Sequence, residues 1–185
     1  MNGEIVIEAV YGERMALIRP TRAEMRSLAE VYRETLAPGA APAIAKLRRA
    51  GVRLVLVSGG FRPAIAPVAK ELGFEDTDLF AVDVYWKESG EYAGFETSSP
   101  LTTQNGKLQI VLKIGLERPT LGVGDGSTDL GMRPGVDEFA AFTGFARREV
   151  IVRDADLEIA SYDELVRYVL DSDQKATTPH TNFHE

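Results

Sequence analysis

The chain has 185 residues, of which 44% are hydrophobic and 26% are charged, and its formal net charge at pH 7 is −7. This length and composition fit one ordinary globular domain and exclude a disordered, collagenous or fibrous protein. The sequence contains no cysteine, which excludes disulfides, thiolate nucleophiles and cysteine-ligated zinc and favours a protein of the reducing cytoplasm.

The charge and hydropathy patterns each exclude a class of partner. The 21 basic residues are scattered and are outnumbered by 28 acidic ones, whereas a nucleic-acid footprint is basic and clustered. No apolar run approaches the roughly 18 residues that cross a bilayer, and no basic segment precedes the first apolar residues as in a signal peptide. We therefore expect no nucleic-acid partner and no membrane association.

Helices are expected first along the chain. Leu17 and Ile18 belong to the apolar face of an amphipathic helix, and Thr21 with Glu24 forms the capping-box pattern that begins a second one. Gly51 suits the position just after the end of a third helix. The expected helices cover residues 1–20, 21–35 and 41–50.

From residue 53 the pattern changes to buried strands that alternate with helices. The continuous apolar run at 53–57 predicts a strand buried on both faces of a parallel sheet, followed by a helix up to Gly73. Ser89 and Gly90 predict the turn of a β-hairpin. This alternation predicts an α/β fold. The expected strands are 53–57, 79–86, 92–95, 120–124, 138–143 and 157–160, and the expected helices are 107–116 and 162–170.

The segment Ser58-Gly59-Gly60 follows the first buried strand, at the edge of the sheet where α/β proteins bind ligands. Glycines at such a place let backbone N–H groups face an anion, and a serine hydroxyl adds a donor. The alternative is that the glycines only form a tight turn from strand to helix.

A second polar segment, Gly124-Asp125-Gly126-Ser127-Thr128-Asp129, follows the strand at 120–124. It is not a dinucleotide fingerprint, because Ser127 stands where that motif needs its third glycine. Asp125 is suited to a hard divalent cation, and Asp129 to pairing with a lysine or capping a helix. The alternative is an Asp-Gly loop followed by a capping aspartate. Taken alone, Lys107 and Arg14 are ordinary solvated helix residues.

The order of these motifs is more specific than any one of them. A strand with Ser-Gly-Gly, then a lysine, then a strand with Gly-Asp-Gly-x-Thr-Asp closely resembles the haloacid dehalogenase superfamily of phosphotransfer enzymes, and within it the phosphoserine phosphatase family. The resemblance extends over roughly residues 1–170. The segments that carry it include 1–4, 13–18, 58–61, 91–95, 105–107 and 123–129.

The resemblance implies a role for each motif residue that binds phosphate. Ser58 and the backbone of Gly59 and Gly60 would hold the phosphoryl oxygens. Lys107 would neutralise the charge of the phosphate and of the nucleophile, and Asp129 would orient Lys107. These roles fit phosphoryl transfer, which depends on positioning and charge neutralisation.

The resemblance also implies a metal ligand and a substrate pocket. Asp125 would bind Mg²⁺, and Thr128 would contact the phosphate or the attacking water. Arg14 would take the carboxylate of a small phosphorylated amino acid, and Met1 and Ile7 would shape the pocket around it.

For the whole chain, the resemblance implies a Rossmann-like parallel sheet with a remnant helical cap. The cap would comprise residues 1–37, the core 38–171, and a disordered tail 172–185. The implied activity is hydrolysis of O-phosphoserine to serine and phosphate in L-serine biosynthesis.

One family motif does not occur in this sequence. It is an apolar strand that ends in D-x-D-x-[ST] and supplies the nucleophilic and acid–base aspartates. We therefore expect the central strand to be absent, leaving a gap between the strands of Ser58 and Asp125, and the chain to be inactive and poorly soluble by itself. Three interpretations stay open: a truncated phosphoserine phosphatase, a non-catalytic phosphoserine-binding or phosphate-binding protein, and a related small-molecule phosphotransferase.

Overall fold

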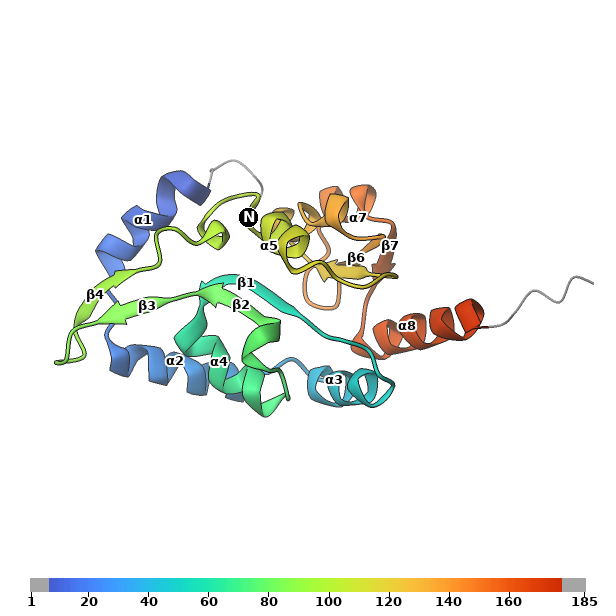
Figure 1. The fold of residues 1–185 in the computed structure, drawn as a ribbon, viewed down its shortest axis with the longest axis horizontal. Coiled ribbons are helices and arrows are strands. Elements are labelled where there is room, and N and C mark those ends of the chain that lie inside the picture. Colours follow the sequence, from blue (N-terminus) through green and yellow to red (C-terminus); the bar gives the residue numbers. More distant parts are fainter. Residues whose placement is uncertain (1–6, 178–185) are drawn as a thin grey trace, which may run out of the picture.

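The structure is a computed structural model that describes residues 7–177, with side chains over residues 11–171. Figure 1 shows its helices and short strands along one long axis. The helices are α1 (Ile7–Ile18), α2 (Arg22–Glu34), α3 (Ala40–Arg49), α4 (Arg62–Glu71), α5 (Gly106–Ile114), α6 (Ser127–Leu130), α7 (Glu149–Asp154) and α8 (Tyr162–Thr177). The strands are β1 (Leu56–Phe61), β2 (Leu79–Val82), β3 (Val84–Trp86), β4 (Tyr92–Phe95), β5 (Leu121–Gly124), β6 (Glu138–Phe142) and β7 (Leu157–Ile159).

The capping box at the start of α2 is confirmed. The Glu24 N–H donates to the Thr21 hydroxyl at 3.2 Å, and the Thr21 N–H donates to the Glu24 carboxylate at 2.7 Å. The predicted apolar face of α1 is wrong at its end, because Leu17 is 84% exposed and Ile18 is also exposed. Met15 is the buried residue there, one turn after Tyr11, so the inward face lies on another side of the helix.

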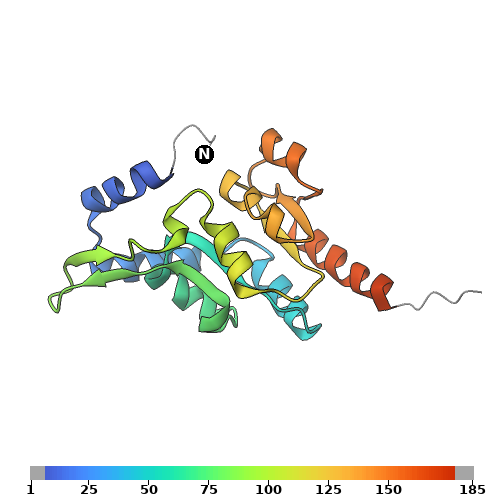
Figure 2. The same ribbon diagram turned by 45° about the horizontal axis from the view of Figure 1, so that its top comes forward.

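The strands of the α/β core lie in two separate parallel sheets. One sheet pairs β1 with β2, and the other has the order β5-β6-β7. Within the described residues, β1 and β5 therefore do not pair with each other, as expected from the sequence. In both Figure 1 and Figure 2, α5 lies between the two sheets. The predicted α/β fold class is confirmed.

The first strand differs from the prediction. A strand buried on both faces was expected at 53–57, but β1 begins at Leu56, continues through the glycines to Phe61, and is half-buried along its length. Its pairing with β2 shifts after Val57, because β1 advances four residues (57 to 61) while β2 advances two (80 to 82). Ser58, Gly59 and Gly60 therefore lie in a bulge of an extended segment, and α4 begins only at Arg62.

The predicted hairpin is confirmed, with one correction. The expected strand at 79–86 is divided into β2 and β3 at Asp83, and β3 pairs antiparallel with β4. The hairpin contacts the start of α2: the Trp86 indole N–H donates to the Pro20 carbonyl at 2.9 Å, and the Arg22 N–H donates to the Gly90 carbonyl at 2.9 Å. The hairpin thus holds the junction between α1 and α2 (Figure 1).

Helix α5 contributes to the hydrophobic cores of both sheets. Ile110 packs with Val82 and Leu101 in the core beside β1 and β2, whereas Val111 packs with Phe139 in the core beside β5–β7. The approach at the start of this helix is close, because a Cβ on Gly106 would lie 1.8 Å from the Pro100 carbonyl oxygen. Lys107 follows Gly106 directly, so the packing of α5 in the two cores fixes the position of the Lys107 backbone.

The C-terminal prediction is partly wrong. Residues 172–177, expected to begin a disordered tail, are helical because α8 continues to Thr177, and residues 178–185 lie outside the described part. The sequence Gln174-Lys175-Ala176 consists of good helix formers, which explains the extension. The predicted boundary between a cap and a core at residue 37 stays a prediction. Across that boundary, α2 packs against α4. None of the helices in residues 7–177 is long and apolar enough to span a bilayer.

Candidate active site

The bulge of β1 is held from two sides. The Ser58 hydroxyl accepts a hydrogen bond from the Gly60 N–H at 3.0 Å, and the Gly59 carbonyl accepts one from the Tyr11 hydroxyl at 3.1 Å. A Cβ on Gly59 would lie 3.1 Å from the Leu101 carbonyl oxygen, so the segment before α5 also touches the bulge. The Gly60 N–H, expected to face an anion, thus has an internal partner that a bound oxyanion would replace.

Tyr11 was not among the residues found by sequence reasoning. Burial, followed by the charge of Tyr92, raises the pKa of Tyr11 to about 12, so its phenol stays protonated and donates at neutral pH. Its ring packs on Phe95 with centroids 5.4 Å apart. Nothing in the local sequence distinguishes this tyrosine from an ordinary helix residue, because Gly59 lies 48 positions away.

A half-buried ion pair joins the two motif regions. The Lys107 ammonium contacts the Asp129 carboxylate at 2.5 Å, and the two side chains are only 17% and 14% exposed. The other oxygen of Asp129 accepts the N–H groups of Gly126 at 3.0 Å and Asp125 at 3.3 Å. A Cβ on Gly124 would lie 2.1 Å from the Asp129 Cβ, so only glycine fits beside this carboxylate.

Asp125 lies in a different environment from Asp129. Its carboxylate forms an ion pair with Arg148, whose guanidinium also donates to the Asp125 backbone carbonyl at 2.6 Å. The Asp125 side chain is 51% exposed and that of Arg148 is 35% exposed. Arg148 stands just before α7 and was not found from the sequence, because its neighbour Arg147 looks the same there.

The described residues do not fit a complete Mg²⁺ site as they are arranged. Residues 11–171 contain no group of three His, Asp or Glu side chains that could hold a metal ion. Asp125 is the expected ligand, and its carboxylate is in contact with a guanidinium; Asp129 is in contact with Lys107. As arranged among residues 11–171, these carboxylates do not gather the several oxygen ligands that Mg²⁺ takes from carboxylates, substrate and water.

The remaining predicted residues lie at the edges of the site. Thr128 is half-buried in α6, directly before Asp129. Arg14 is exposed on α1, one turn after Tyr11, so the two side chains share a face of the helix. Met1 lies outside the described residues, and Ile7 begins α1 with its side chain outside the described part.

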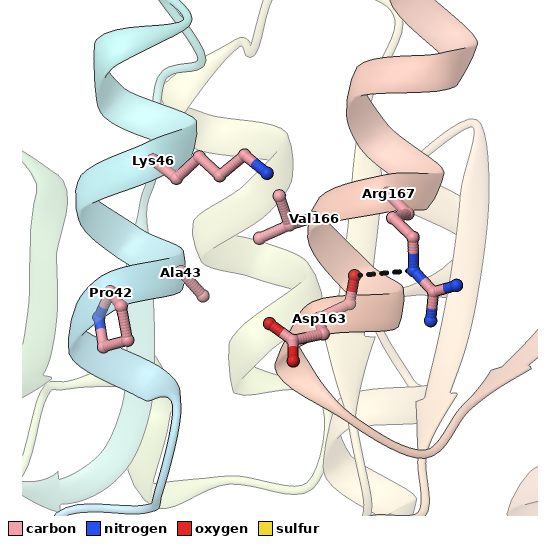
Figure 3. A pocket seen from close by; sticks show the side chains of 6 residues that line it. All are labelled: Pro42, Ala43, Lys46, Asp163, Val166 and Arg167. Atoms are coloured by element: carbon pink, nitrogen blue, oxygen red, sulfur yellow. Dashed lines mark hydrogen bonds between the residues drawn. The ribbon is translucent and has the colours of Figure 1, made fainter.

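A groove of about 390 Å³ elsewhere in the molecule does not include these residues. It lies between α3 and α8, where Figure 3 shows Lys46 and Asp163 beside Val166. A backbone oxygen of Asp163 accepts a hydrogen bond from the Arg167 guanidinium at 3.3 Å. None of the residues that line this groove was predicted to be functional. The motif residues lie elsewhere, around α5.

The elements that carry the motif residues meet around α5. Helix α5, which carries Lys107, packs against both β1 with the Ser58 bulge and α6 with Thr128. An ammonium group and hydroxyl donors on fixed elements neutralise and orient phosphoryl oxygens. The elements that carry the predicted phosphate-binding residues therefore adjoin one another around α5.

Comparison with known proteins agrees with this fold and these motifs. The model of the haloacid dehalogenase-like hydrolase family matches residues 7–134. The chain belongs to this family of hydrolases, which its α/β core and its motifs also indicate.

Similar proteins and solved structures indicate which group of haloacid dehalogenase-like hydrolases the chain belongs to. The chain is 31% identical to phosphoserine phosphatase of Bos taurus, over 90% of this chain and 75% of the relative, and 32% identical to the chloroplastic enzyme of Arabidopsis thaliana, of which it spans 58%. A phospho-aspartyl intermediate analogue of a phosphoserine phosphatase superposes with a TM-score of 0.73 at 26% identity, over 90% of this chain and 79% of that one. Within the hydrolase family, the chain is a member of the phosphoserine phosphatases.

Proposed function

We propose that this chain serves the hydrolysis of O-phosphoserine to serine and phosphate, the step that ends L-serine biosynthesis. The observation that carries the proposal is the Lys107–Asp129 ion pair, which is largely buried and joins α5 to α6. Curated relatives with at least 31% identity are phosphoserine phosphatases. The substrate class is therefore a small phosphorylated amino acid.

In this proposal the phosphate is held by three kinds of donor. Lys107 supplies the positive charge, and Asp129 fixes the direction of its ammonium group. The hydroxyls of Ser58, in the bulge of β1, and of Thr128, in α6, approach the phosphoryl oxygens, and the Gly60 N–H becomes available when the Ser58 hydroxyl turns to the ligand. Such fixed donors stabilise a phosphoryl group without rearranging during the reaction.

Arg14 is proposed to recognise the carboxylate of the substrate. Its helix is connected to the bulge of β1 by the Tyr11–Gly59 hydrogen bond, and Arg14 shares the Tyr11 face of α1. Its side chain is exposed and makes no ion pair with the side chains of residues 11–171. Arginine is suited to this role because its planar fork binds carboxylates with two parallel hydrogen bonds.

Turnover needs a nucleophile, and Asp125 and Asp129 cannot serve as one in this arrangement. Both carboxylates are held by basic side chains of the chain itself, and the D-x-D-x-[ST] motif that supplies the nucleophile does not occur in the sequence. We therefore propose that the 185-residue chain by itself binds O-phosphoserine without hydrolysing it. Mg²⁺, which the family generally uses, would find one ligand in Asp125. We also propose a cytoplasmic location, on the composition alone.

The first test measures O-phospho-L-serine binding and phosphate release with the full chain. Lys107→Ala should weaken binding at least about tenfold, because a charge-assisted contact is lost. Lys113→Ala is the matched control, since Lys113 is an exposed lysine in the last turn of the same helix. Equal affinities of the two variants would contradict the proposed phosphate site. Sustained phosphate release by the unmodified chain would contradict the inactivity.

The second test concerns Arg14. Arg14→Ala should weaken O-phosphoserine binding about tenfold and leave the binding of O-phosphoethanolamine, which has no carboxylate, within about twofold. Isothermal titration calorimetry with both ligands measures the difference. An equal loss for the two ligands would show that Arg14 does not read the carboxylate.

A non-catalytic phosphoserine-binding protein is the second candidate. The observation that favours it is that both aspartates at the end of β5 are neutralised by basic side chains of the chain itself. Selectivity for O-phosphoserine over O-phosphothreonine is expected for it, and turnover by the chain alone is expected for neither candidate. Turnover of another phosphorylated amino acid instead would favour a related phosphotransferase.

A further inference from the structure

Asp125, a motif residue, forms an ion pair with Arg148, which belongs to none of the motifs. The guanidinium contacts two acceptors of one residue, the carboxylate and the backbone carbonyl of Asp125. Because it contacts two oxygens of one residue, the guanidinium has less freedom to move than it would with a single surface contact. The Arg148 guanidinium thus contacts the same carboxylate, at the end of β5, that was expected to bind Mg²⁺.

The position of Arg148 is fixed by the element that follows it. Its carbonyl accepts the N–H groups of Ile151 and Val152 at 3.0 Å each, which forms the first turn of α7. Ile151 is buried in the core beside β5–β7, so α7 is anchored under the site. Arg147, one residue earlier, instead pairs with Glu149 and Glu158 on the exposed surface.

The charges around the end of β5 are therefore balanced without any ion. Asp129 is paired with Lys107, and Asp125 is paired with Arg148, so two carboxylates face two basic groups. A phosphate that enters this region does not meet an uncompensated negative charge. Coulomb repulsion between a phosphate and a bare carboxylate at contact distance is on the order of 1 kcal/mol in water and larger near a protein surface.

We propose that Arg148 is the counter-ion of Asp125, and that it allows this site to bind phosphate without a metal ion. The inference rests on the phosphate site proposed above. It adds Arg148 to that site and predicts that phosphate binds there without a metal ion. It follows that Mg²⁺ and the Arg148 guanidinium compete for the same carboxylate. Removing the guanidinium makes phosphate binding depend on Mg²⁺.

The test titrates inorganic phosphate into the full chain by isothermal titration calorimetry, once with EDTA and once with Mg²⁺. The unmodified chain should bind with affinities within about twofold in the two conditions. Arg148→Ala should bind about tenfold more weakly in EDTA, because Asp125 then repels the phosphate, and Mg²⁺ should restore its affinity. Arg147→Ala is the matched control and should behave like the unmodified chain.

A double variant identifies Asp125 as the cause. Asp125→Asn combined with Arg148→Ala removes both charges and should recover the affinity in EDTA and abolish the response to Mg²⁺. This result also excludes misfolding of Arg148→Ala as the reason for its weak binding. Failure of the double variant to recover would overturn the proposal, as would Arg148→Ala binding like the unmodified chain.

The outcomes separate this inference from the proposed function. Phosphate binding by the unmodified chain only in the presence of Mg²⁺ overturns the role of Arg148 and leaves the phosphate site intact. No phosphate binding in either condition overturns the proposed phosphate site and the inference with it. Lys107→Ala, tested in the same titration, should lose affinity in both conditions, because its charge is needed whether or not a metal ion is present.

Discussion

At the scale of single residues, the site is organised by hydrogen bonds between distant parts of the chain. Tyr11 on α1 donates to the carbonyl of Gly59, and this bond connects the helix that carries Arg14 to the bulge of β1. The bond is partly buried and the tyrosine ring is held against Phe95. We therefore expect Tyr11 to be a positioning residue, which affects ligand binding through the β1 bulge and not by contact.

Tyr11→Phe tests that role. The ring keeps its packing on Phe95, but the Gly59 carbonyl loses its donor, so we expect the free energy of unfolding to fall by about 1 kcal/mol. O-phosphoserine affinity should fall about threefold, because the β1 bulge and Arg14 are then less firmly aligned. Chemical denaturation and calorimetry measure the two effects. A loss of stability with unchanged affinity would assign Tyr11 a purely structural role.

The raised pKa of Tyr11 also makes stability depend on pH in the alkaline range. The folded pKa is about 12 and the ordinary value is 10.0, so between these pH values the unfolded chain loses this proton and the folded chain keeps it. The contribution of Tyr11 is present below pH 10 and is lost as the pH rises towards 12. The stability difference between the unmodified chain and Tyr11→Phe should therefore shrink over that range.

At the scale of elements, α5 is the part of the fold on which the site depends. Its neighbouring residues Ile110 and Val111 enter different cores, so the helix connects the two sheets mechanically. Its first residue, Gly106, packs directly on the backbone of Pro100. Lys107 follows at once, and any shift of the helix start moves its ammonium group away from Asp129.

Gly106→Ala should therefore damage both stability and the site. The added Cβ would lie 1.8 Å from a backbone oxygen, which cannot move as a side chain can, so a loss of about 2 kcal/mol or more is expected. Gly12→Ala is the matched control, because nothing lies within 4 Å of its Cβ and alanine favours the helix. Thermal unfolding compares the two. A Gly106→Ala chain as stable as the control would show that this close approach is not required.

At the scale of the whole molecule, the two parallel sheets each end at a strand that pairs on one side. In the part of the chain that the structure describes, β1 pairs with β2 and β5 pairs with β6, and each leaves its other edge without a ladder. Backbone N–H and C=O groups along such edges are templates for pairing with another chain. The exposed side chains of Leu112 on α5 and of Phe145 and Val150 around the start of α7 add apolar surface.

We therefore expect the 185-residue chain made alone to self-associate. Size-exclusion chromatography with light scattering over increasing concentrations should show growing oligomers, and added phosphate should reduce them by binding between the sheets. A single monomeric species at all concentrations would contradict the expectation.

The sequence predicted the positions of most elements because their signals are local. The capping box of Thr21 and Glu24, the hairpin around Gly90 and the strands at β5, β6 and β7 depend on neighbours within a few residues. The predictions that failed depend on contacts with distant elements. The buried face of α1 is decided by Met15 and not by Leu17, and the bounds of β1 are decided by its pairing with β2 alone.

The sequence by itself determined the class of chemistry, since the Ser-Gly-Gly and Gly-Asp-Gly-x-Thr-Asp segments are short motifs whose residue types and spacing are legible along the chain. Only the tertiary structure decided how the charges are paired. Arg148 reaches Asp125 across 23 positions, Lys107 reaches Asp129 across 22, and Tyr11 reaches Gly59 across 48. Folding selects these partners because an ion pair or hydrogen bond depends on distance in space, and one-dimensional spacing does not encode that distance.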